Sequence, residues 1–499
     1  MTAKSIWIEL DSLHSSILLR GVRDGIMPNL ARLMARSGAT RVNYEIPLQV
    51  AAWATAHTGL SVADHGATAF DQPIPGTYRM RIQPRPVKPG STYWEVLGRS
   101  GKRVLVVNSV NAIHTPGVNG IQLNEWATHV AGRRAKATSY PSEIAASLDR
   151  EFPDDPFAEK DCGSDKYADA DRLGNSISAS LANKSKAFAN LIDREDWDHV
   201  HIGIDDLHNL GHVLWRCFEK NDPGNAMVRR ALTDADAAVG VFLNRAGPDT
   251  AAIVLLLGGI GPANTWSHMV DKIIARFENG GSRERNLYST LGHVWAAQPP
   301  WLENKLLPLK SYLREFYLET KRRRRRAFAM PLNEETGTIR INLRGREPHG
   351  VVEPGKEAKA LKEDLREALL GLRDVDSNIP LVTEVQFSRD LVPEAVDSLS
   401  MPDMFITWNR TKRMDAVQSE RLGRIEMGFW PPRTGDHQVD GLVLTNRPIA
   451  HGRSSRDGVS VFDLAPTIAA LHGVACHKKW RGTALAGLSQ SMAGETVAV

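Results

Sequence analysis

The stretch HVHIGIDDLHNLGHVLW, residues 199–215, carries the strongest structural signal of the chain. Its first part, residues 199–204, is typical of a buried strand. His208 and His212 follow it four positions apart, so they lie on one face of a helix that begins after the strand. Two histidines so placed can bind one metal ion, although at this spacing histidines are more often surface or core residues. The sequence therefore predicts a strand, a helix and a candidate pair of metal ligands.

Similar aliphatic runs recur along the chain, most of them separated by helix-like sequence. They lie at residues 5–10, 103–108, 251–257 and 441–445. Helices are predicted over residues 28–38, which have a proline near the start and a glycine at the end, in the segment before Gly247, and over residues 462–471. This alternation predicts an α/β fold with a doubly wound, mainly parallel sheet.

The pattern changes over residues 265–429. Polar helix-like sequence, including residues 306–320, and an irregular β portion with strand-like runs at 338–343 and 404–408 replace the regular alternation. We interpret this region as an inserted α+β cap domain. Residues 1–264 and 430–499 then form the α/β core.

The composition indicates a globular protein of two or three folding units, because 42% of its 499 residues are hydrophobic. No secretory signal or apolar run of membrane-spanning length is seen, and three scattered cysteines form no disulfide framework or thiolate cluster, so we expect a cytoplasmic protein without membrane contacts. Lys+Arg 62 nearly balance Asp+Glu 58, and the basic run at residues 321–326 is more typical of a solvated helix end than of a nucleic-acid contact.

Several motifs, in order along most of the chain, resemble the type I phosphodiesterase and nucleotide pyrophosphatase-like branch of the alkaline phosphatase superfamily. These motifs are PNLARL (28–33), AWATAHTGL (52–60) with DHG (64–66), RVLVVN (103–108) with TPGVNG (115–120), IRINLRGREPHG (339–350), TGDH (434–437) with DG (440–441), and LAPTI (464–468). The resemblance implies an alkaline-phosphatase-type core, two metal ions at the carboxyl ends of the strands, and a Thr or Ser nucleophile between them.

The nucleophile and one metal site of that family are altered here. Asp11 falls at the first carboxylate ligand, but Gln49 falls at the nucleophile position, and a carboxamide has no ionisable nucleophilic oxygen. The Asp-His ligand pair that the resemblance implies is replaced by Leu257 and Gly258, neither of which can coordinate a metal through its side chain. The second-metal site therefore keeps only Asp11.

The other metal site keeps three side chains that can coordinate a metal. Where the family uses an Asp, a His four residues later and a distant His, this chain has His208, His212 and His437. Three imidazoles with an open fourth position are typical of a zinc centre that lowers the pKa of bound water toward roughly 7. Carboxylates that could orient an imidazole or accept a proton are Asp11, Asp205, Asp206 and Asp436.

Two hypotheses follow, and the first is slightly favoured. The protein is a pseudoenzyme for ordinary two-metal phosphodiester hydrolysis and serves as a ligand-binding or protein-complex subunit, because a missing metal removes a large catalytic term. Alternatively, it is a one-zinc hydrolase of a phosphoester or related anion that uses metal-bound hydroxide, with Asp11 as base or water-positioning group and Gln49 donating to a phosphoryl oxygen.

The cap region contains candidate ligand-binding residues of its own. Asn342, Arg344 and Arg346 are candidates for contact with an anionic substrate. A hydrogen-bond network inside the cap is the simpler and favoured interpretation of the same side chains.

Overall fold

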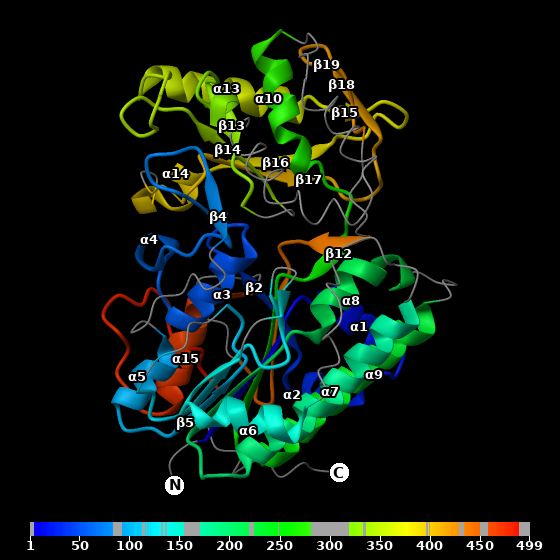
Figure 1. Ribbon diagram of the computed structural model, residues 1–499, viewed down its shortest axis with the longest axis vertical. Coiled ribbons are helices and arrows are strands. Elements are labelled where there is room, and N and C mark those ends of the chain that lie inside the picture. Colours follow the sequence, from blue (N-terminus) through cyan, green and yellow to red (C-terminus); the bar gives the residue numbers. More distant parts are fainter. Residues whose placement is uncertain are drawn as a thin grey trace. The chain divides into compact units, whose positions relative to one another are not determined.

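The computed structural model describes most of the chain (Figure 1). The described residues are 4–82, 92–111, 115, 117–130, 133–134, 137–153, 170–218, 224–247, 249–280, 319–332, 336–395, 398, 400–428, 434–449 and 458–488. The chain divides into two compact units. The first unit comprises Met1–Ala69, Pro84–Ala263 and Pro431–Val499, and the second comprises Phe70–Gln83 and Asn264–Trp430.

The first unit is built on a nine-stranded sheet with the order β22-β2-β21-β11-β1-β10-β5-β6-β9. The five strands predicted from sequence are present as β1 (Ser5–Leu10), β5 (Val104–Val107), β10 (His199–Ile204), β11 (Ala251–Leu257) and β21 (Gly441–Thr445). The remaining strands of this sheet are β2 (Ala39–Asn43), β6 (Gly120–Asn124), β9 (Thr138–Tyr140) and β22 (Val459–Ser460).

The sheet is parallel from β11 through β1, β10 and β5 to β6, whereas β21 runs antiparallel to β11 and to β2. Every residue of β1, β10 and β11 is buried, as expected for parallel strands covered on both faces. The predicted doubly wound, mainly parallel α/β fold is confirmed.

Helices cover both faces of this sheet (Figure 1). One core contains Ile6, Ile8 and Ile202 from the sheet, packed under one set of helices. That set comprises α1 (Ser15–Arg23), α2 (Pro28–Ser37), α7 (Ala170–Ile192), α8 (Asp206–Leu214) and α9 (Asn225–Ala246). The opposite core contains Trp7 and Leu255, which point to the other face because side chains alternate along a strand. Its helices are α3 (Gln49–Thr58), α5 (Tyr93–Arg99) and α15 (Leu464–Leu471).

Shorter elements complete the first unit. They are α4 (Val62–His65), β7 (His129–Val130), β8 (Arg133–Arg134), α6 (Glu143–Glu151), η1 (Trp215–Phe218), β12 (Ile260–Pro262), β20 (Gly435–His437) and η4 (Val461–Asp463). The antiparallel pair β12 and β20 places His437 opposite Ile260, just beyond the end of β11.

The parallel strands β11, β1 and β10 are adjacent, so their carboxyl ends meet at one edge of the sheet. The chain turns sharply there, because Ser12 (φ 65°) and Gly258 (φ 67°) both adopt the left-handed conformation just after β1 and β11. A serine rarely adopts this conformation, and such backbone is often found at functional sites. This edge is where ligands bind in open α/β sheets.

The second unit has its own core around a four-stranded antiparallel sheet with the order β13-β14-β17-β16 and a three-stranded sheet with the order β15-β18-β19. Its strands are β3 (Asp71–Pro73), β4 (Met80–Ile82), β13 (Ala327–Ala329), β14 (Gly337–Ile341), β15 (Arg373–Asp374), β16 (Val382–Phe387), β17 (Met404–Trp408), β18 (Ala416–Ser419) and β19 (Gly423–Glu426). Its helices are η2 (Ser267–Met269), α10 (Val270–Glu278), α13 (Lys356–Leu370), α14 (Ser388–Leu391) and η3 (Pro393–Ala395).

The hairpin β3–β4 clusters with the second unit, although the sequence-based division placed it in the core. Its Tyr78 explains the difference. The Tyr78 hydroxyl donates to Asn342 Oδ1 at 2.7 Å, and its ring packs edge-on against Phe328 at 5.4 Å between centroids. These contacts join residues more than 200 positions apart, which no local sequence pattern reveals.

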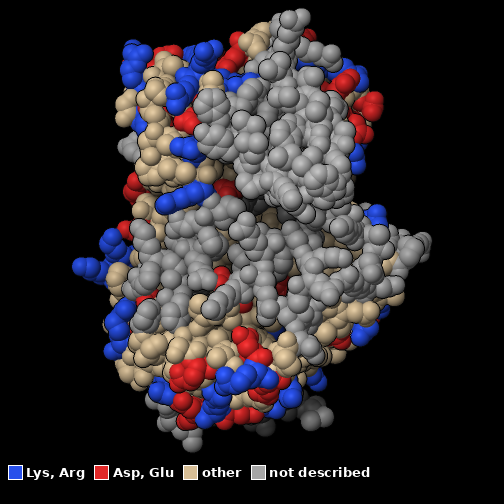
Figure 2. Space-filling model, in the orientation of Figure 1, with Lys and Arg blue, Asp and Glu red and all other residues tan. Residues whose placement is uncertain are grey.

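The described part of the basic run is bound within the second unit. Arg322 donates to the Tyr78 carbonyl at 2.6 Å, and Arg325 donates to the Asp271 carbonyl at 2.8 Å. The preceding predicted helix lies outside the described residues up to position 318. On the face shown in Figure 2, acidic and basic side chains are intermingled over the described residues. None of the described helices is both long and apolar enough to span a membrane.

Candidate metal centre

Three histidines converge at the carboxyl edge of the first unit's sheet. His208 and His212 lie one turn apart on α8, which follows β10, and His437 ends β20. The ring centroids are 4.7 to 4.8 Å apart for all three pairs. The structure thus brings together the three side chains that the sequence analysis named as ligands.

Hydrogen bonds at Nδ1 fix the orientation of each imidazole. His212 Nδ1 is 2.9 Å from the Gly435 carbonyl oxygen, and His437 Nδ1 is 3.1 Å from that of Gly258. A carbonyl oxygen only accepts, so each Nδ1 carries the proton and the neutral ring presents an unprotonated Nε2. His208 Nδ1 lies 2.9 Å from Asp11 Oδ2, an arrangement typical of metal-bound histidines.

The donor set fits a divalent zinc ion. The Nε2 atoms of His208 and His212 are 3.0 Å apart, and the ligating atoms of all three rings lie within 4.8 Å of one another. Nitrogens bound tetrahedrally at 2.0–2.1 Å would be separated by about 3.3 Å. The His208 side chain is 33% exposed, while His212 and His437 are buried, so solvent reaches one side of the cluster.

Asp11 and Gln49 form a buried pair beside these imidazoles. Gln49, the first residue of α3, donates its amide to Asp11 Oδ1 at 2.9 Å, while Asp11 Oδ2 faces His208. The Gln49 side chain also covers Gly258 so closely that a Cβ placed there would overlap its Cγ and Cδ. The two positions where the resemblance implies a nucleophile and a second-metal ligand are therefore in mutual contact.

Tyr44 supports the turn that carries Gly258, a role that the sequence patterns do not predict. Its hydroxyl donates to the Asp440 carbonyl at 2.6 Å and accepts from the Gly258 N–H at 2.7 Å. This contact holds the backbone of the residue whose carbonyl orients His437. No motif marks Tyr44, because its role comes from contacts with two distant segments.

Lys184 engages the two carboxylates that begin α8. It is buried on α7 and lies 2.6 Å from Asp205 Oδ1 and 2.8 Å from Asp206 Oδ2. Burial lowers the pKa of Lys184, but the two carboxylates raise it above its usual value. Burial raises the pKa of Asp205, opposed by Lys184. Asp205 and Asp206 thus anchor the helix that bears two of the histidines. Lys184 belongs to no motif from which this role could be predicted.

The cap-region candidates lie in the second unit and are bound to neighbouring residues. Asn342 is fully buried, and its amide donates to the Arg325 carbonyl at 2.8 Å. Arg344 pairs with Glu353 at the surface, and Arg346 pairs with Asp403 at 2.6 Å. Their role in binding substrate stays a prediction.

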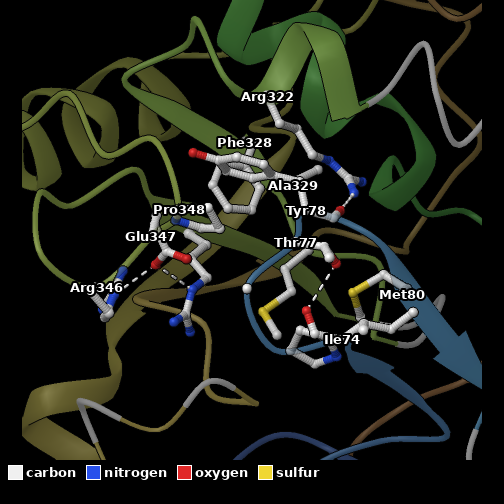
Figure 3. A pocket seen from close by; sticks show the side chains of 14 residues that line it. Ile74, Thr77, Tyr78, Met80, Arg322, Phe328, Ala329, Arg346, Glu347 and Pro348 are labelled. Atoms are coloured by element: carbon white, nitrogen blue, oxygen red, sulfur yellow. Dashed lines mark hydrogen bonds and ion pairs between the residues drawn. The ribbon is translucent and has the colours of Figure 1, made fainter.

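A pocket within the second unit lies beside this network (Figure 3). Figure 3 shows Tyr78 and Phe328 on one side of it, with Arg346 linked to Glu347 nearby. Burial and Arg346 lower the pKa of Arg340, which shares Glu347.

Sequence and structure comparisons show the family of the chain. The sequence model described as type I phosphodiesterase / nucleotide pyrophosphatase matches residues 5–406. No curated protein matches the chain significantly. Phosphonoacetate hydrolase from Sinorhizobium meliloti 1021, solved with phosphonoformate, has a TM-score of 0.52 at 14% identity over 95% of this chain and 96% of that one. Wild-type alkaline phosphatase PafA has a TM-score of 0.50 at 12% identity over 97% and 98% of the two chains.

These structural similarities confirm the predicted alkaline-phosphatase-type fold, and at such identities they establish the fold alone. The family match carries the assignment, because it extends over most of the chain. The protein is a member of the type I phosphodiesterase / nucleotide pyrophosphatase family.

Proposed function

We propose that this family member binds one divalent metal ion, zinc by ligand type, through His208, His212 and His437, and does not perform two-metal phosphodiester hydrolysis. Its function is metal-dependent binding of a phosphoester or related anion, alone or as a subunit of a protein complex. The observation that carries the proposal is the contact of Gln49 with Asp11 and Gly258.

That contact involves both features that two-metal hydrolysis needs, the nucleophile and the second metal site. A carboxamide at the nucleophile position cannot form a covalent phosphoryl-enzyme. Gly258 offers no ligand, and the space beside it is filled by the Gln49 side chain. Asp11, the remaining carboxylate, already accepts from Gln49 and faces His208. These contacts leave Asp11 to orient an imidazole.

The protein's own residues define what the centre can do. The carbonyl groups of Gly435 and Gly258 and the Asp11 carboxylate hold the three rings with Nε2 directed to a common region. A zinc ion held there supplies Lewis acidity toward an anionic oxygen of a ligand. The amide of Gln49 is fixed beside the same edge by Asp11.

Metal analysis and ligand titration test this proposal. Purified wild-type protein should contain zinc that is lost in His437→Ala. Calorimetric titration with inorganic phosphate and AMP should show binding to the zinc-loaded wild type and not to His437→Ala. Hydrolysis of bis-p-nitrophenyl phosphate should not exceed that of His437→Ala. The proposal would be rejected if wild type hydrolysed this substrate faster than His437→Ala, or if anion binding did not depend on zinc.

A second function is favoured by one observation, the exposed side of His208. Structural zinc sites are closed, whereas catalytic ones combine three protein ligands with an open position. A one-zinc hydrolase would use that position for a phosphoester or related anion. Zinc-dependent turnover of a panel of phosphate, sulfate and phosphonate esters, abolished by His208→Ala, would establish it in place of the first function.

A further inference from the structure

A second group of potential ligands is buried in the first unit and shares no residue with the three-histidine cluster. Glu9 on β1, His57 in the last turn of α3 and His201 on β10 are each 0% exposed, and their ligand atoms lie within 4.8 Å of one another. Trp7 pairs with His201 across the parallel strands, so His201 and Glu9 point to the same face of the sheet.

The Glu9 carboxylate lies at the centre of this group. Its Oε1 is 2.5 Å from His57 Nε2 and 3.1 Å from His201 Nε2, and its Oε2 accepts from the Val110 N–H at 2.8 Å. The Ser109 hydroxyl oxygen lies 3.4 Å from His57 Nε2. One carboxylate and two imidazoles form a nitrogen and oxygen donor set that suits zinc.

A chain of buried hydrogen bonds constrains the protons on His201. Its Nδ1 is 2.5 Å from the Tyr93 hydroxyl, which is 3.1 Å from His199 Nε2. His199 Nδ1 is in turn 2.7 Å from Ser5 Oγ, and Ser5 Oγ is 2.7 Å from His472 Nε2. A phenol donates a single proton, so Tyr93 donates to either His201 or His199.

The geometry at His201 distinguishes these two arrangements. If Tyr93 donated to His201, the neutral ring would carry its proton on Nε2 and would donate it to Glu9. His201 Nε2 lies 3.1 Å from Glu9 Oε1, but an N–H on this nitrogen would be poorly aligned with that oxygen. The other arrangement puts the proton on Nδ1. The unprotonated Nε2 then faces the carboxylate oxygen.

Two lone pairs facing each other in a fully buried site repel unless a cation lies between them. We propose that Glu9, His57 and His201 bind a second divalent metal ion, zinc by ligand type, in a closed structural site beside the Ser109 hydroxyl. Tetrahedral ligands are about 3.3 Å apart, so His57 Nε2 would move away from Glu9 Oε1 by about 0.8 Å. Complete burial fits a structural site, which the metal enters during folding.

The proposal does not depend on the function proposed for the three-histidine cluster. The alternative to a bound metal ion is an additional proton. One imidazole would then be an imidazolium, and the cluster would be held by hydrogen bonds alone. Metal content separates the two, because a hydrogen-bonded cluster retains no zinc. The near-isosteric Glu9→Gln removes the anionic ligand and keeps the side-chain volume. Glu95→Gln is a matched control, because Glu95 is also buried, caps α5 through Thr92 and lies outside the proposed ligand set.

The test measures zinc per chain in full-length protein from zinc-supplemented cells, after dialysis against a weak chelator. We expect two equivalents in wild type and Glu95→Gln, one in His437→Ala, one in Glu9→Gln, and none in the double variant. If Glu9→Gln does not fold, His57→Gln replaces it. If the three-histidine cluster bound no zinc and the second site did, wild type would contain one equivalent and Glu9→Gln none. Equal zinc in wild type and Glu9→Gln, or none in His437→Ala, would overturn the proposal.

Discussion

Asp11→Asn offers a sharp test of the arrangement around the three-histidine cluster. Asp11 Oδ2 is 2.9 Å from His208 Nδ1, so the carboxylate fixes both the tautomer and the orientation of that ring. Replacing such a partner of a metal-bound histidine typically lowers metal affinity 10- to 100-fold, or about 1.4 to 2.8 kcal/mol. We therefore expect a weakened site that still binds zinc.

For Asp11→Asn, the contacts in the structure predict a loss of zinc affinity near the lower end of that range. The asparagine carbonyl can still accept from His208, and its amide can donate to Gln49 once the Gln49 amide rotates, so the loss is mainly that of the charge-assisted bond. A fall of about tenfold is expected, against about 100-fold for Asp11→Ala, in which no acceptor remains.

The assay is competition for zinc between the protein and a chromophoric chelator at neutral pH, with His437→Ala as the variant that lacks a ligand. We expect zinc affinity to fall in the order wild type, Asp11→Asn, Asp11→Ala, His437→Ala. An affinity for Asp11→Asn equal to that of wild type would refute the orienting role. A loss as large as that in His437→Ala would instead make Asp11 a direct ligand.

Three further predictions concern stability. Gly258→Ala should destabilise the fold by about 2 kcal/mol in urea denaturation, from its positive φ and its overlap with Gln49, and less in a Gln49→Ala background; equal losses in both backgrounds would contradict the contact. Lys184→Met should cost about 3 kcal/mol or more, because two carboxylates lose their buried partner, and a loss under 1 kcal/mol would argue against that role. Burial lowers the pKa of His472 to about 4, from 6.5, so the unfolded chain binds the extra proton between these values. Stability should therefore be full above pH 6.5 and fall by up to about 3 kcal/mol toward pH 4, and His472→Gln should flatten that part of the profile; an unchanged slope would exclude His472 as its source.

The sequence by itself determined the fold class and the candidate metal ligands. β11 is a continuous aliphatic run, and β1 and β10 are rich in apolar residues, because both faces of a parallel sheet are buried. Such runs can be recognised from the local sequence. The spacing of His208 and His212 is likewise a local property of a helix. His437 was added by resemblance to a family motif, and the structure brings it to the other two.

Only the tertiary structure decided which groups surround those ligands. The contacts of Asp11 with Gln49, of Lys184 with Asp205, and of Glu9 with His57 join distant segments, and no sequence period encodes such pairings. The spacing of His199 and His201 along β10 indicates that both side chains lie on one face of the strand. It does not indicate which carboxylate that face meets. Local spacing fixes which side chains share an element, whereas their partners depend on how the elements pack.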